Sequence, residues 1–437
     1  MSNIATYERM KDSKERWLGD IPSTWNTRLL KYMFSIKKNI AGETGHQVLS
    51  VTQKGIVPKN MTERGQFSLD YSKYQLVEAG DFVMNHMDLL TGWVDISKYD
   101  GVTSPDYRVF VNNNPDSFDS KYYNYIFQYC YSNRIFYGLG QGVAGYGRWR
   151  LPTDMFMNFA LPVPPIDQQR RISYFLDKQC AQIDSIIEDT KSSVEEYKKW
   201  KASIIFEAVT KGIVPGVEMR DSGLHEFGNI PKTWYITKTL HCLSMPITDG
   251  PHTTPEFFDS GVPFVSAEAI SCGNGKIAFD HIRGYISEEF YQECCKKYIP
   301  QIDDIYMIKS GATTGKVAIV DTDIKFTIWS PIAVFRADKS RILPKFLFYA
   351  LQSPSYQTQV ALGWTYGTQQ NIGMRTLETL KLCVPSLEEQ KQIVAYLDRL
   401  CSEMDALISE KEALVSDLEV YKRSLVFETV TGKRKVV

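Results

Sequence analysis

The sequence lacks the features that mark membrane, secreted and zinc-binding proteins. It contains no apolar run of about 18 residues, and its first residues are too charged for a signal peptide. Its 8 cysteines include no Cys-x-x-Cys pair, and only Cys294 and Cys295 lie close together in the sequence. This cysteine usage argues against a zinc knuckle and indicates reduced thiols in a cytoplasm.

An excess of charge of one sign is also absent. The 50 Lys and Arg residues face 51 Asp and Glu residues, which gives a formal net charge of −1. Any nucleic-acid binding would therefore depend on a local basic patch. The length of 437 residues suggests two or three domains, and 43% hydrophobic with 23% charged residues is typical of a globular protein.

Catalytic and cofactor motifs are missing as well. The segment SGATTGKVA at 310–318 hints at a phosphate loop, but its glycines are too close together, so a structural turn is expected. There is no Asp/Asn-Pro-Pro-Tyr/Phe motif and no glycine-rich cofactor loop after a strand, which argues against a self-contained adenine methyltransferase. The 6 histidines show no metal-ligand spacing. The sequence therefore predicts a non-enzyme that itself binds no metal and no cofactor.

Two alternatives from other functional classes remain open. Asp106, Asp119 and Lys121 mimic a nuclease core, but the second half has no acid after Pro331, and a helix is expected to begin near Asp119. A helix cap is therefore the favoured interpretation of Asp119. If the chain were a nuclease, it would cut DNA without partner proteins when a metal ion is supplied. A purely structural scaffold would leave no footprint on DNA.

What the sequence does contain is an internal duplication. MKDSKERWLGDIPSTW at 10–25 matches MRDSGLHEFGNIPKTW at 219–234 without gaps, and a longer match aligns 161–190 with 382–411. Between these shared blocks lie two stretches that resemble each other only faintly. The repeat is far too long for a solenoid, so the chain is a duplicated two-part unit.

The shared blocks predict two long helices. After Pro164-Pro165 and Pro385, no proline or glycine occurs until Gly212 and Gly432. Each block can therefore form one helix of roughly 45 residues, on the order of 65 Å long. A two-fold axis relating the halves would reverse direction, so we expect the two helices to pack antiparallel.

Alternating steps of three and four residues along both blocks form a heptad seam. The seam residues are Leu176, Cys180, Ile183, Ile187, Val194, Leu397, Cys401, Met404, Ile408 and Val415. Polar residues interrupt the seam at matching heights, Thr190 with Lys411 and Lys201 with Lys422. Such interruptions are typical of helices whose register is specified.

The variable stretches predict compact α/β domains, because short β-branched and aromatic runs such as 46–52, 107–111 and 332–336 are bounded by turns. The expected fold class is α+β, with two α/β domains separated by two long helices packed as an antiparallel coiled coil, in a pseudo-two-fold internal duplication. The expected boundaries are 1–21 for an N-terminal segment, 22–163 for the first domain, 164–215 for the central helix, 216–384 for the second domain and 385–437 for the C-terminal helix.

Two pairs of polar, glycine-bearing loops occur at corresponding places in the two halves. QGVAGYGRWRL at 141–151 corresponds to WTYGTQQNIGMRTL at 364–377, and NHMDLLTGW at 85–93 corresponds to IKSGATTGK at 308–316. Arg pairs well with guanine, and Gln or Asn with adenine, in the major groove. Such side chains can also be merely solvated, but corresponding loops with different side chains favour base recognition.

These segments together resemble the DNA-specificity subunit of Type I restriction-modification systems. The resemblance runs essentially end to end and rests on the 10–25 block and its copy, on residues 77–110, 249–270 and 308–320, and on the glycine loops. It implies two target recognition domains, an antiparallel coiled coil between them and no catalytic activity. The glycine loops read GYGRWRL and GTQQNIG, so contacts cannot be copied from one half to the other.

The resemblance also implies the function and partners. The chain would read an asymmetric bipartite target in double-stranded DNA, with one half-site per domain and a spacer set by the coiled coil. It would recruit two methyltransferase subunits, which hold S-adenosylmethionine, and two restriction/translocase subunits, which hold ATP and Mg. The candidate DNA-binding residues are Thr52, Lys54, Asn85, His86, Tyr146, Arg148, Trp149, Arg150, Thr253, Lys309, Thr313, Lys316, Tyr366, Gln369, Gln370, Asn371 and Arg375.

Overall fold

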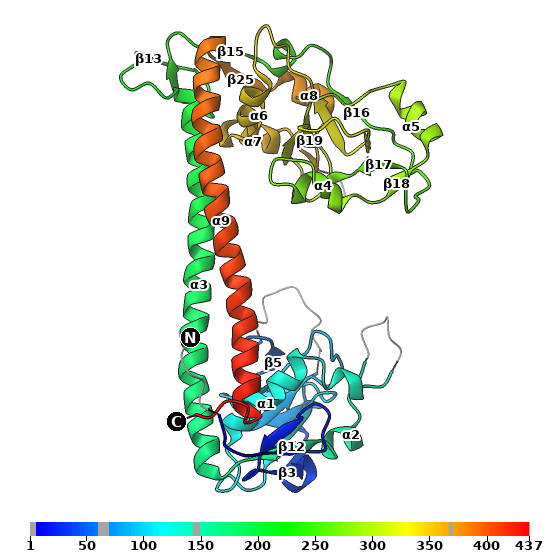
Figure 1. Ribbon diagram of the computed structural model, residues 1–437, viewed down its shortest axis with the longest axis vertical. Helices are drawn as coiled ribbons and strands as arrows, with labels where there is room; N and C mark the ends of the chain where they lie inside the picture. The colour runs from blue at the N-terminus through cyan, green and yellow to red at the C-terminus, as the bar shows by residue number, and fades with distance from the viewer. Residues whose placement is uncertain (1–5, 60–69, 143–148, 367–369, 437) are drawn as a thin grey trace. The chain divides into compact units, whose positions relative to one another are not determined.

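The chain divides into two compact units. The first unit contains Met1–Thr190 and Ala413–Val437, and the second contains Lys191–Glu412. Each unit combines one mixed α/β domain with segments of the same two long helices. The computed structural model describes residues 6–59, 70–142, 149–366 and 370–436 (Figure 1).

The two long helices form where the sequence predicts them. Helix α3 covers Ile166–Lys211 with 46 residues, and helix α9 covers Leu387–Val430 with 44 residues (Figure 1). Each helix is followed closely by a glycine with positive φ, 78° at Gly212 and 75° at Gly432. Glycine adopts this left-handed conformation without a steric penalty, and it therefore ends the helices.

The long helices pack against each other in antiparallel directions. In the second unit, Lys198 Nζ lies 3.1 Å from Glu412 Oε1, and Lys201 Nζ lies 2.6 Å from Asp405 Oδ1. A later residue of α3 thus meets an earlier residue of α9. The antiparallel coiled coil is therefore confirmed.

One of the two matched polar breaks in the seam, Lys201 with Lys422, forms equivalent ion pairs in the two units. Lys201 pairs with Asp405 in the second unit, and Lys422 Nζ lies 2.6 Å from Asp184 Oδ2 in the first. The repeat aligns Lys201 with Lys422 and Asp184 with Asp405. The structure buries all the residues assigned to the apolar seam, which are Leu176, Cys180, Ile183, Ile187, Val194, Leu397, Cys401, Met404, Ile408 and Val415.

Each domain is built on a four-stranded antiparallel sheet with the same strand order. In the first domain the order β4-β11-β8-β9 comprises Phe34–Lys37, Arg108–Asn112, Phe82–Met84 and Val94–Ile96. In the second domain the order β16-β22-β19-β20 comprises Thr248–Asp249, Ile332–Phe335, Ile305–Ile308 and Val317–Ile319. The variable stretches therefore keep a common topology although their sequences have diverged.

Short elements complete the two units. The first unit also has β1 (Met10–Asp12), β2 (Asp20–Pro22), β3 (Asn26–Leu29), β5 (Leu49–Thr52), β6 (Gly55–Pro58), β7 (Gln75–Val77), β10 (Gly101–Thr103), β12 (Ala160–Val163), α1 (Ser120–Ser132) and α2 (Thr153–Met157). The second unit also has β13 (Met219–Asp221), β14 (Asn229–Pro231), β15 (Tyr235–Lys238), β17 (Val262–Val265), β18 (Tyr285–Ile286), β21 (Thr327–Ile328), β23 (Thr365–Tyr366), β24 (Gln370–Asn371), β25 (Lys381–Val384), α4 (Ala267–Cys272), α5 (Glu288–Cys295), α6 (Pro344–Gln352), α7 (Pro354–Leu362) and α8 (Met374–Thr379).

The residues of the nuclease alternative serve the fold. Asp119 caps α1, and its Oδ1 accepts a hydrogen bond from Tyr122 N at 2.7 Å, which confirms the capping interpretation. Lys121 Nζ pairs with Asp177 of α3 at 2.8 Å. Asp106 lies in the turn that leads into β11.

A buried glutamine near the start of each long helix holds the adjacent domain. Gln169 accepts a hydrogen bond from the N–H of Asp119, the residue that caps α1, at 2.8 Å. Its counterpart Gln390 accepts from the N–H of Leu343, which precedes α6, at 2.7 Å. A buried backbone N–H needs such a partner. The same residue of the repeat therefore anchors a helix of each divergent domain.

The repeated tryptophan acts in the same way in both units. Trp25 Nε1 donates to Gln168 Oε1 at 2.8 Å, and Trp234 Nε1 donates to Glu389 Oε1 at 3.0 Å. Both indoles are nearly inaccessible to solvent. The shared blocks therefore attach two different domains to the long helices through the same hydrogen bonds.

Candidate nucleic-acid interface

The two candidate loops of the first domain meet each other. The loop 85–93 follows the carboxyl end of β8, and the glycine loop 141–151 leads into α2. Leu151 N donates to His86 O at 3.0 Å and thereby joins the two loops. Segments that are distant in the sequence thus form one surface.

The corresponding loops of the second domain meet in the same way. Ile372 N donates to Lys309 O at 2.9 Å, directly after the end of β19. Gly311 N donates to Gln370 O at 3.0 Å. The same loop junction therefore occurs at equivalent strands of both sheets, and it carries different side chains in each.

A buried arginine supports the junction of the first domain. Arg108 of β11 donates to Leu151 O at 2.9 Å and to Thr153 Oγ1 at 3.2 Å. Burial lowers the pKa of its guanidinium to about 10. Sequence reasoning missed this residue, although a lone cation within the apolar run YRVFV is a signal that could have found it.

His86 is a half-buried residue at the same junction. Its Nδ1 is inaccessible and has no hydrogen-bond partner among the described residues. Burial, with the charges of Arg108 and Arg150, lowers the pKa of this imidazole to about 4. His86 is therefore neutral at physiological pH, and it contacts the glycine loop through its backbone.

The glycine loop of the first domain presents Arg150 and uses Trp149 as an anchor. Trp149 Nε1 donates to Tyr137 O at 2.8 Å, and the two rings lie 5.5 Å apart. Arg150 pairs through its backbone with Gln141 and has an exposed side chain. Tyr146 and Arg148, which the sequence also suggests, lie outside the described residues.

Three other candidates of the first domain have local structural roles. Thr52 Oγ1 donates to Gly55 O at 2.9 Å and accepts from Lys54 N at 3.2 Å, so it forms the turn between β5 and β6. Lys54 is exposed at that turn. Asn85 Oδ1 accepts from Met87 N at 3.2 Å. Contacts of these residues with DNA stay predictions.

Exposed amides and an arginine gather at the junction of the second domain. Gln370 and Asn371 form the exposed strand β24, and Arg375 is exposed on α8. Tyr366 pairs with Gln370 through its backbone, but its side chain and the whole of Gln369 lie outside the described residues. This side chain set offers donors and acceptors suited to base edges.

The remaining candidates of the second domain lie in three segments, directly after β19, in the turn that precedes β20 and in the loop that follows β16. Lys316 is exposed and donates to Ser271 O at 3.2 Å, and Thr313 is half-buried in the same turn. Thr253 is exposed in the loop that follows β16. Lys309 is largely buried and lies 3.3 Å from Asp249, an acid that sequence reasoning did not single out.

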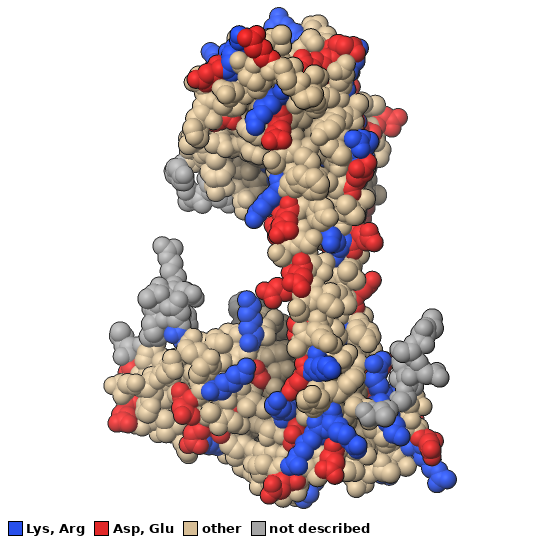
Figure 2. All heavy atoms as spheres, turned by 90° about the vertical axis from the view of Figure 1, so that its left-hand side faces the viewer, with Lys and Arg blue, Asp and Glu red and all other residues tan. Residues whose placement is uncertain are grey.

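No single-sign field covers the surface that Figure 2 presents. Lys and Arg are interspersed with Asp and Glu over this face (Figure 2). None of the described helices is long and apolar enough to cross a membrane. Within the described ranges, no three His, Cys, Asp or Glu residues form a group that could hold a metal ion.

The depressed pKa of His86 predicts a specific pH dependence of stability. Unfolding returns the imidazole to its usual pKa near 6.5, whereas the folded group resists protonation until about pH 4. The unfolded chain therefore binds more protons between these values, and stability falls as the pH falls through this window. At about pH 5 the loss should be at most about 2 kcal/mol.

The variant His86→Leu isolates this contribution, because it removes the titrating imidazole and fills the half-buried position with an apolar side chain. Thermal unfolding of the full chain at about pH 7.5 and at about pH 5 measures the effect. The drop in Tm between the two conditions should be smaller in the variant than in the wild type. An equal drop in both proteins would contradict the buried neutral imidazole.

Comparison with known proteins identifies the family of this chain. A model described as the Type I restriction modification DNA specificity domain matches residues 22–196 and 250–416. The MjaVIII type I restriction enzyme specificity subunit of Methanocaldococcus jannaschii is 25% identical over 296 residues, which cover 67% of this chain and 66% of that protein. The putative MjaX specificity subunit of the same organism is 22% identical over 421 residues, which cover 90% and 91% of the two chains.

The fold also matches a solved structure. A chain from a structure described as the basis of complex assembly and conformational transition of the type I R-M system has a TM-score of 0.66 with 15% sequence identity. The match covers 94% of this chain and 98% of the other. At this identity the likeness shows a shared fold.

Proposed function

Because this chain belongs to the family of type I restriction-modification DNA specificity subunits, we propose that it reads an asymmetric bipartite target in double-stranded DNA. Members of this family are non-catalytic DNA-recognition components. One half-site is read by each domain. The observation that carries this proposal is the equivalent loop junction of the two domains, which presents different side chains in each.

The side chains at the two junctions differ in the bases that they can recognise. The first junction offers Arg150, whose guanidinium fits the O6 and N7 atoms of guanine. The second offers Gln370 and Asn371, whose amides fit N6 and N7 of adenine, beside Arg375. Different donor and acceptor sets select different bases, so the two half-sites differ in sequence.

The variant Arg150→Ala tests this reading directly. Loss of a guanine contact should weaken binding by about 1–3 kcal/mol and relax specificity at one position of one half-site. The measurement is competitive binding of the assembled complex to targets that vary at each position. Arg375→Ala is the matched variant, and its effect should fall on the other half-site.

Each result for Arg150 has a distinct meaning. A uniform loss over all sequences would make Arg150 a phosphate contact, and no loss would return it to a merely solvated side chain. If both variants relaxed the same half-site, the assignment of one half-site to each domain would be wrong.

We propose that the long helices set the spacer between the half-sites. The ion pairs Lys201–Asp405 and Lys422–Asp184, one in each unit, oppose sliding of α3 along α9. The buried seam residues lie on the same two helices and oppose sliding as well, because sliding would expose apolar side chains. The duplication and the antiparallel helices suit the two-fold symmetry of the DNA backbone, so the two domains read the strands in opposite senses.

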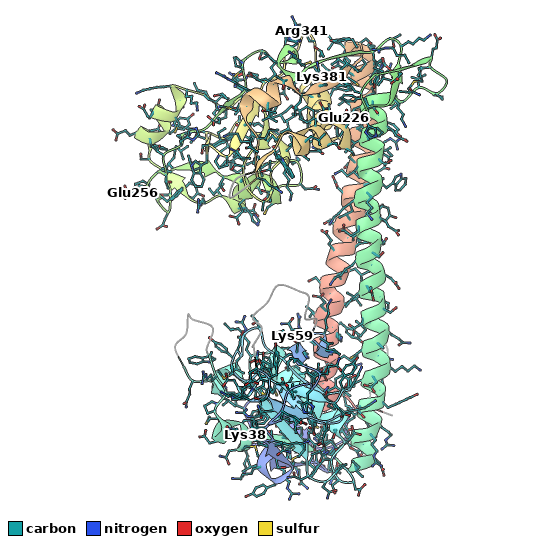
Figure 3. The ribbon with its side chains drawn as sticks, turned by 180° about the vertical axis from the view of Figure 1, so that it is seen from behind. Lys38, Lys59, Glu226, Glu256, Arg341 and Lys381 are labelled. Atoms are coloured by element: carbon teal, nitrogen blue, oxygen red, sulfur yellow. The ribbon has the colours of Figure 1, made fainter. Side chains whose placement is uncertain are left out.

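The same helices are proposed to recruit the partner subunits. Side chains project outward along α3 and α9 (Figure 3), and among them are exposed apolar residues. Ile186 and Leu407 are 48% and 41% exposed, and Trp200 and Tyr421 are 57% and 47% exposed. The repeat aligns Ile186 with Leu407 and Trp200 with Tyr421. A partner site that is present twice supports binding of two copies of one subunit.

These copies are proposed to be two methyltransferase subunits, which carry S-adenosylmethionine and methylate an adenine flipped out of each half-site. Two restriction/translocase subunits, which carry ATP and Mg, would join the complex for cleavage. This chain itself would bind no cofactor and would act in the cytoplasm, where the DNA lies.

Exposed aromatic residues at a binding surface carry much of the affinity, so truncation of Trp200 or Tyr421 should weaken recruitment. Trp200→Ser is expected to cost about 1–3 kcal/mol of binding energy for one methyltransferase copy, and Tyr421→Ser the same for the other. The double variant should bind neither copy tightly. Mass measurement of the assembled complex checks the stoichiometry, and full assembly by the double variant would contradict this surface.

A further inference from the structure

The second domain contains a buried carboxylate surrounded by more positive charge than its neutralisation requires. Asp249, at the end of β16, has a side chain that is only 1% exposed. Lys297 Nζ contacts its Oδ1, while Lys309 Nζ and His252 Nε2 each lie 3.3 Å from its Oδ2. These four residues form the Asp249 cluster.

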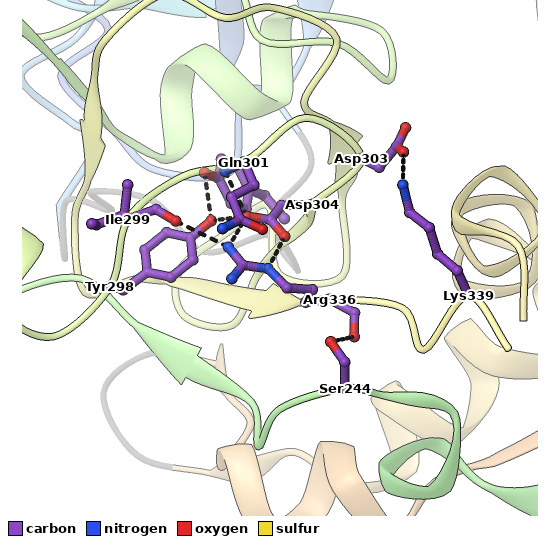
Figure 4. Close-up of polar contacts among 9 residues, drawn as sticks. Ser244, Tyr298, Ile299, Gln301, Asp303, Asp304, Arg336 and Lys339 are labelled. Carbon is purple, nitrogen blue, oxygen red and sulfur yellow. Dashed lines mark hydrogen bonds and ion pairs between the residues drawn. The ribbon is translucent and has the colours of Figure 1, made fainter. Parts of the chain in front are cut away.

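Another buried acid of the same domain, Asp304, is neutralised by a single cation. Asp304 receives two hydrogen bonds from Arg336, both at 2.7 Å, and one from the hydroxyl of Tyr298 (Figure 4). One cation thus satisfies one carboxylate in a bidentate pair. The Asp249 cluster holds two lysines and a histidine for a single carboxylate.

Two of the nitrogen-bearing side chains of the cluster are accessible to a ligand. The side chains of Lys297 and His252 are 48% and 72% exposed, whereas that of Lys309 is 13% exposed. An ammonium carries three donors. Lys297 directs one to Asp249 and one to Gly250 O at 3.4 Å, so one donor remains for an anion. Burial raises the pKa of Asp249, but Lys297 and then Lys309 hold that pKa below its usual value, so the carboxylate remains charged.

The cluster is built into the loop junction of the second domain. Lys309 N donates to Pro331 O at 2.7 Å, and Lys309 O accepts from Ile372 N at 2.9 Å, one residue after Asn371. Ser330 N donates to Pro251 O at 3.2 Å and links the loop of His252 to the same place. The backbone of Lys309 therefore belongs to the junction that carries the side chains proposed to read bases, and Asp249 joins Lys297 and His252 to Lys309.

The loop that carries Asp249 is held close to its neighbour. A Cβ at Gly250 would lie 2.0 Å from Ile328 O, so only glycine permits this approach. Next to that contact, the guanidinium of Arg283 lies 4.9 Å from the centre of the Trp329 ring. Arg283 is itself exposed and adds a further cation to this side of the domain.

We propose that Lys297 and His252 bind a phosphate of the DNA backbone at the second half-site, with Asp249 as the positioning residue that holds them beside Lys309. The proposal rests on the proposed function and deepens it by assigning a backbone contact that fixes the second domain on its half-site. Phosphate contacts orient a protein on the duplex without reading its sequence. The observation behind it is the pair of lysines around one buried carboxylate, of which Lys309 lies at the reading junction.

The test uses the assembled complex of the full chain with its methyltransferase subunits, and binding is measured over a range of salt concentrations. Lys297→Met removes the charge and keeps an apolar stem. It should weaken binding to cognate DNA and to unrelated DNA by the same factor. The slope of log K against log salt concentration should fall by about 0.9, the value for one lost phosphate contact.

Two further variants make the result decisive. Lys276→Met is the matched control, because Lys276 also pairs with an acid of this domain, Asp321 at 2.8 Å, and should leave the slope unchanged. Asp249→Asn makes the chain more positive, so general attraction would tighten binding, whereas loss of positioning should weaken it. Thermal unfolding identifies any variant that fails to fold.

The outcomes separate this proposal from the function on which it rests. An unchanged slope and affinity for Lys297→Met would overturn the phosphate site and leave a structural ion-pair cluster. A loss confined to cognate DNA would overturn it in favour of a base contact. Failure of the wild-type complex to bind DNA at all would instead overturn the proposed function.

Discussion

Exchange of residues 22–160 for the first domain of another family member is expected to replace one half-site of the target and to leave the other half-site unchanged. The two domains have separate hydrophobic cores. Each is attached to the long helices through the repeated block, by Gln169 in the first unit and Gln390 in the second. A new domain that keeps these attachment points should therefore be accepted without disturbance of the other.

The sequence of the methylated motif in cells measures this result, and exchange of the second domain supplies the reciprocal control. The specificity of the unchanged half-site should be retained in full, because its loop junction contains only residues of its own domain. A change of both half-sites after one exchange would contradict the modular account. Loss of all methylation with a folded, assembled complex would show that the domains read DNA only as a matched pair.

Insertion of one heptad into each long helix, after Glu188 and after Ser409, should change the spacer or abolish recognition. One heptad keeps the seam in phase and adds roughly 10 Å to each helix. This length is close to three base pairs at about 3.4 Å each. The degenerate spacer should therefore lengthen by about one to three base pairs, unless the added rotation along the groove prevents binding.

Insertion of about four residues into α3 alone is the matched control. It would displace Lys201 relative to Asp405 or Lys422 relative to Asp184 and break the seam, so the helices should no longer pair stably. Retention of the original spacer at full affinity after the paired insertion would contradict the account. In that case the partner subunits would set the spacer.

The long helices could be predicted almost to the residue because nothing in the sequence competes with them. Proline at Pro165 and Pro385 and glycine at Gly212 and Gly432 delimit blocks without an internal breaker, and the heptad pattern supplies a buried face. Helical contacts are local, so local patterning is sufficient. The pairing Lys201–Asp405 then follows from the antiparallel register that the duplication implies.

For the sheets, the sequence predicts individual strands but not their order. The runs containing Phe82–Met84 and Ile332–Phe335 are recognisable from their composition. Their order in the sheet depends on pairing between segments far apart in the sequence, which composition does not encode. The strand order is therefore known from the structure, whereas the duplication suggests only that the two sheets share one order.

The candidate loops could be identified from the sequence, but the roles of individual side chains could not. Trp149 was a candidate for DNA binding, and its indole is engaged by the carbonyl of Tyr137. The roles of Arg108 and Asp249 do not follow from the sequence, because the burial of a charged group depends on partners such as Lys297 that lie elsewhere in the chain. Only Arg108, a single charge inside the apolar run YRVFV, has a sequence pattern that indicates a buried supporting role.

Sequencing of N6-methyladenine in the genome of a cell that expresses this chain with its cognate methyltransferase subunit tests the central claim most directly. We expect one new split motif with two unlike half-sites, a degenerate spacer of constant length and a methylated adenine in each half-site. A continuous or palindromic motif, or no new motif from an assembled complex, would contradict it.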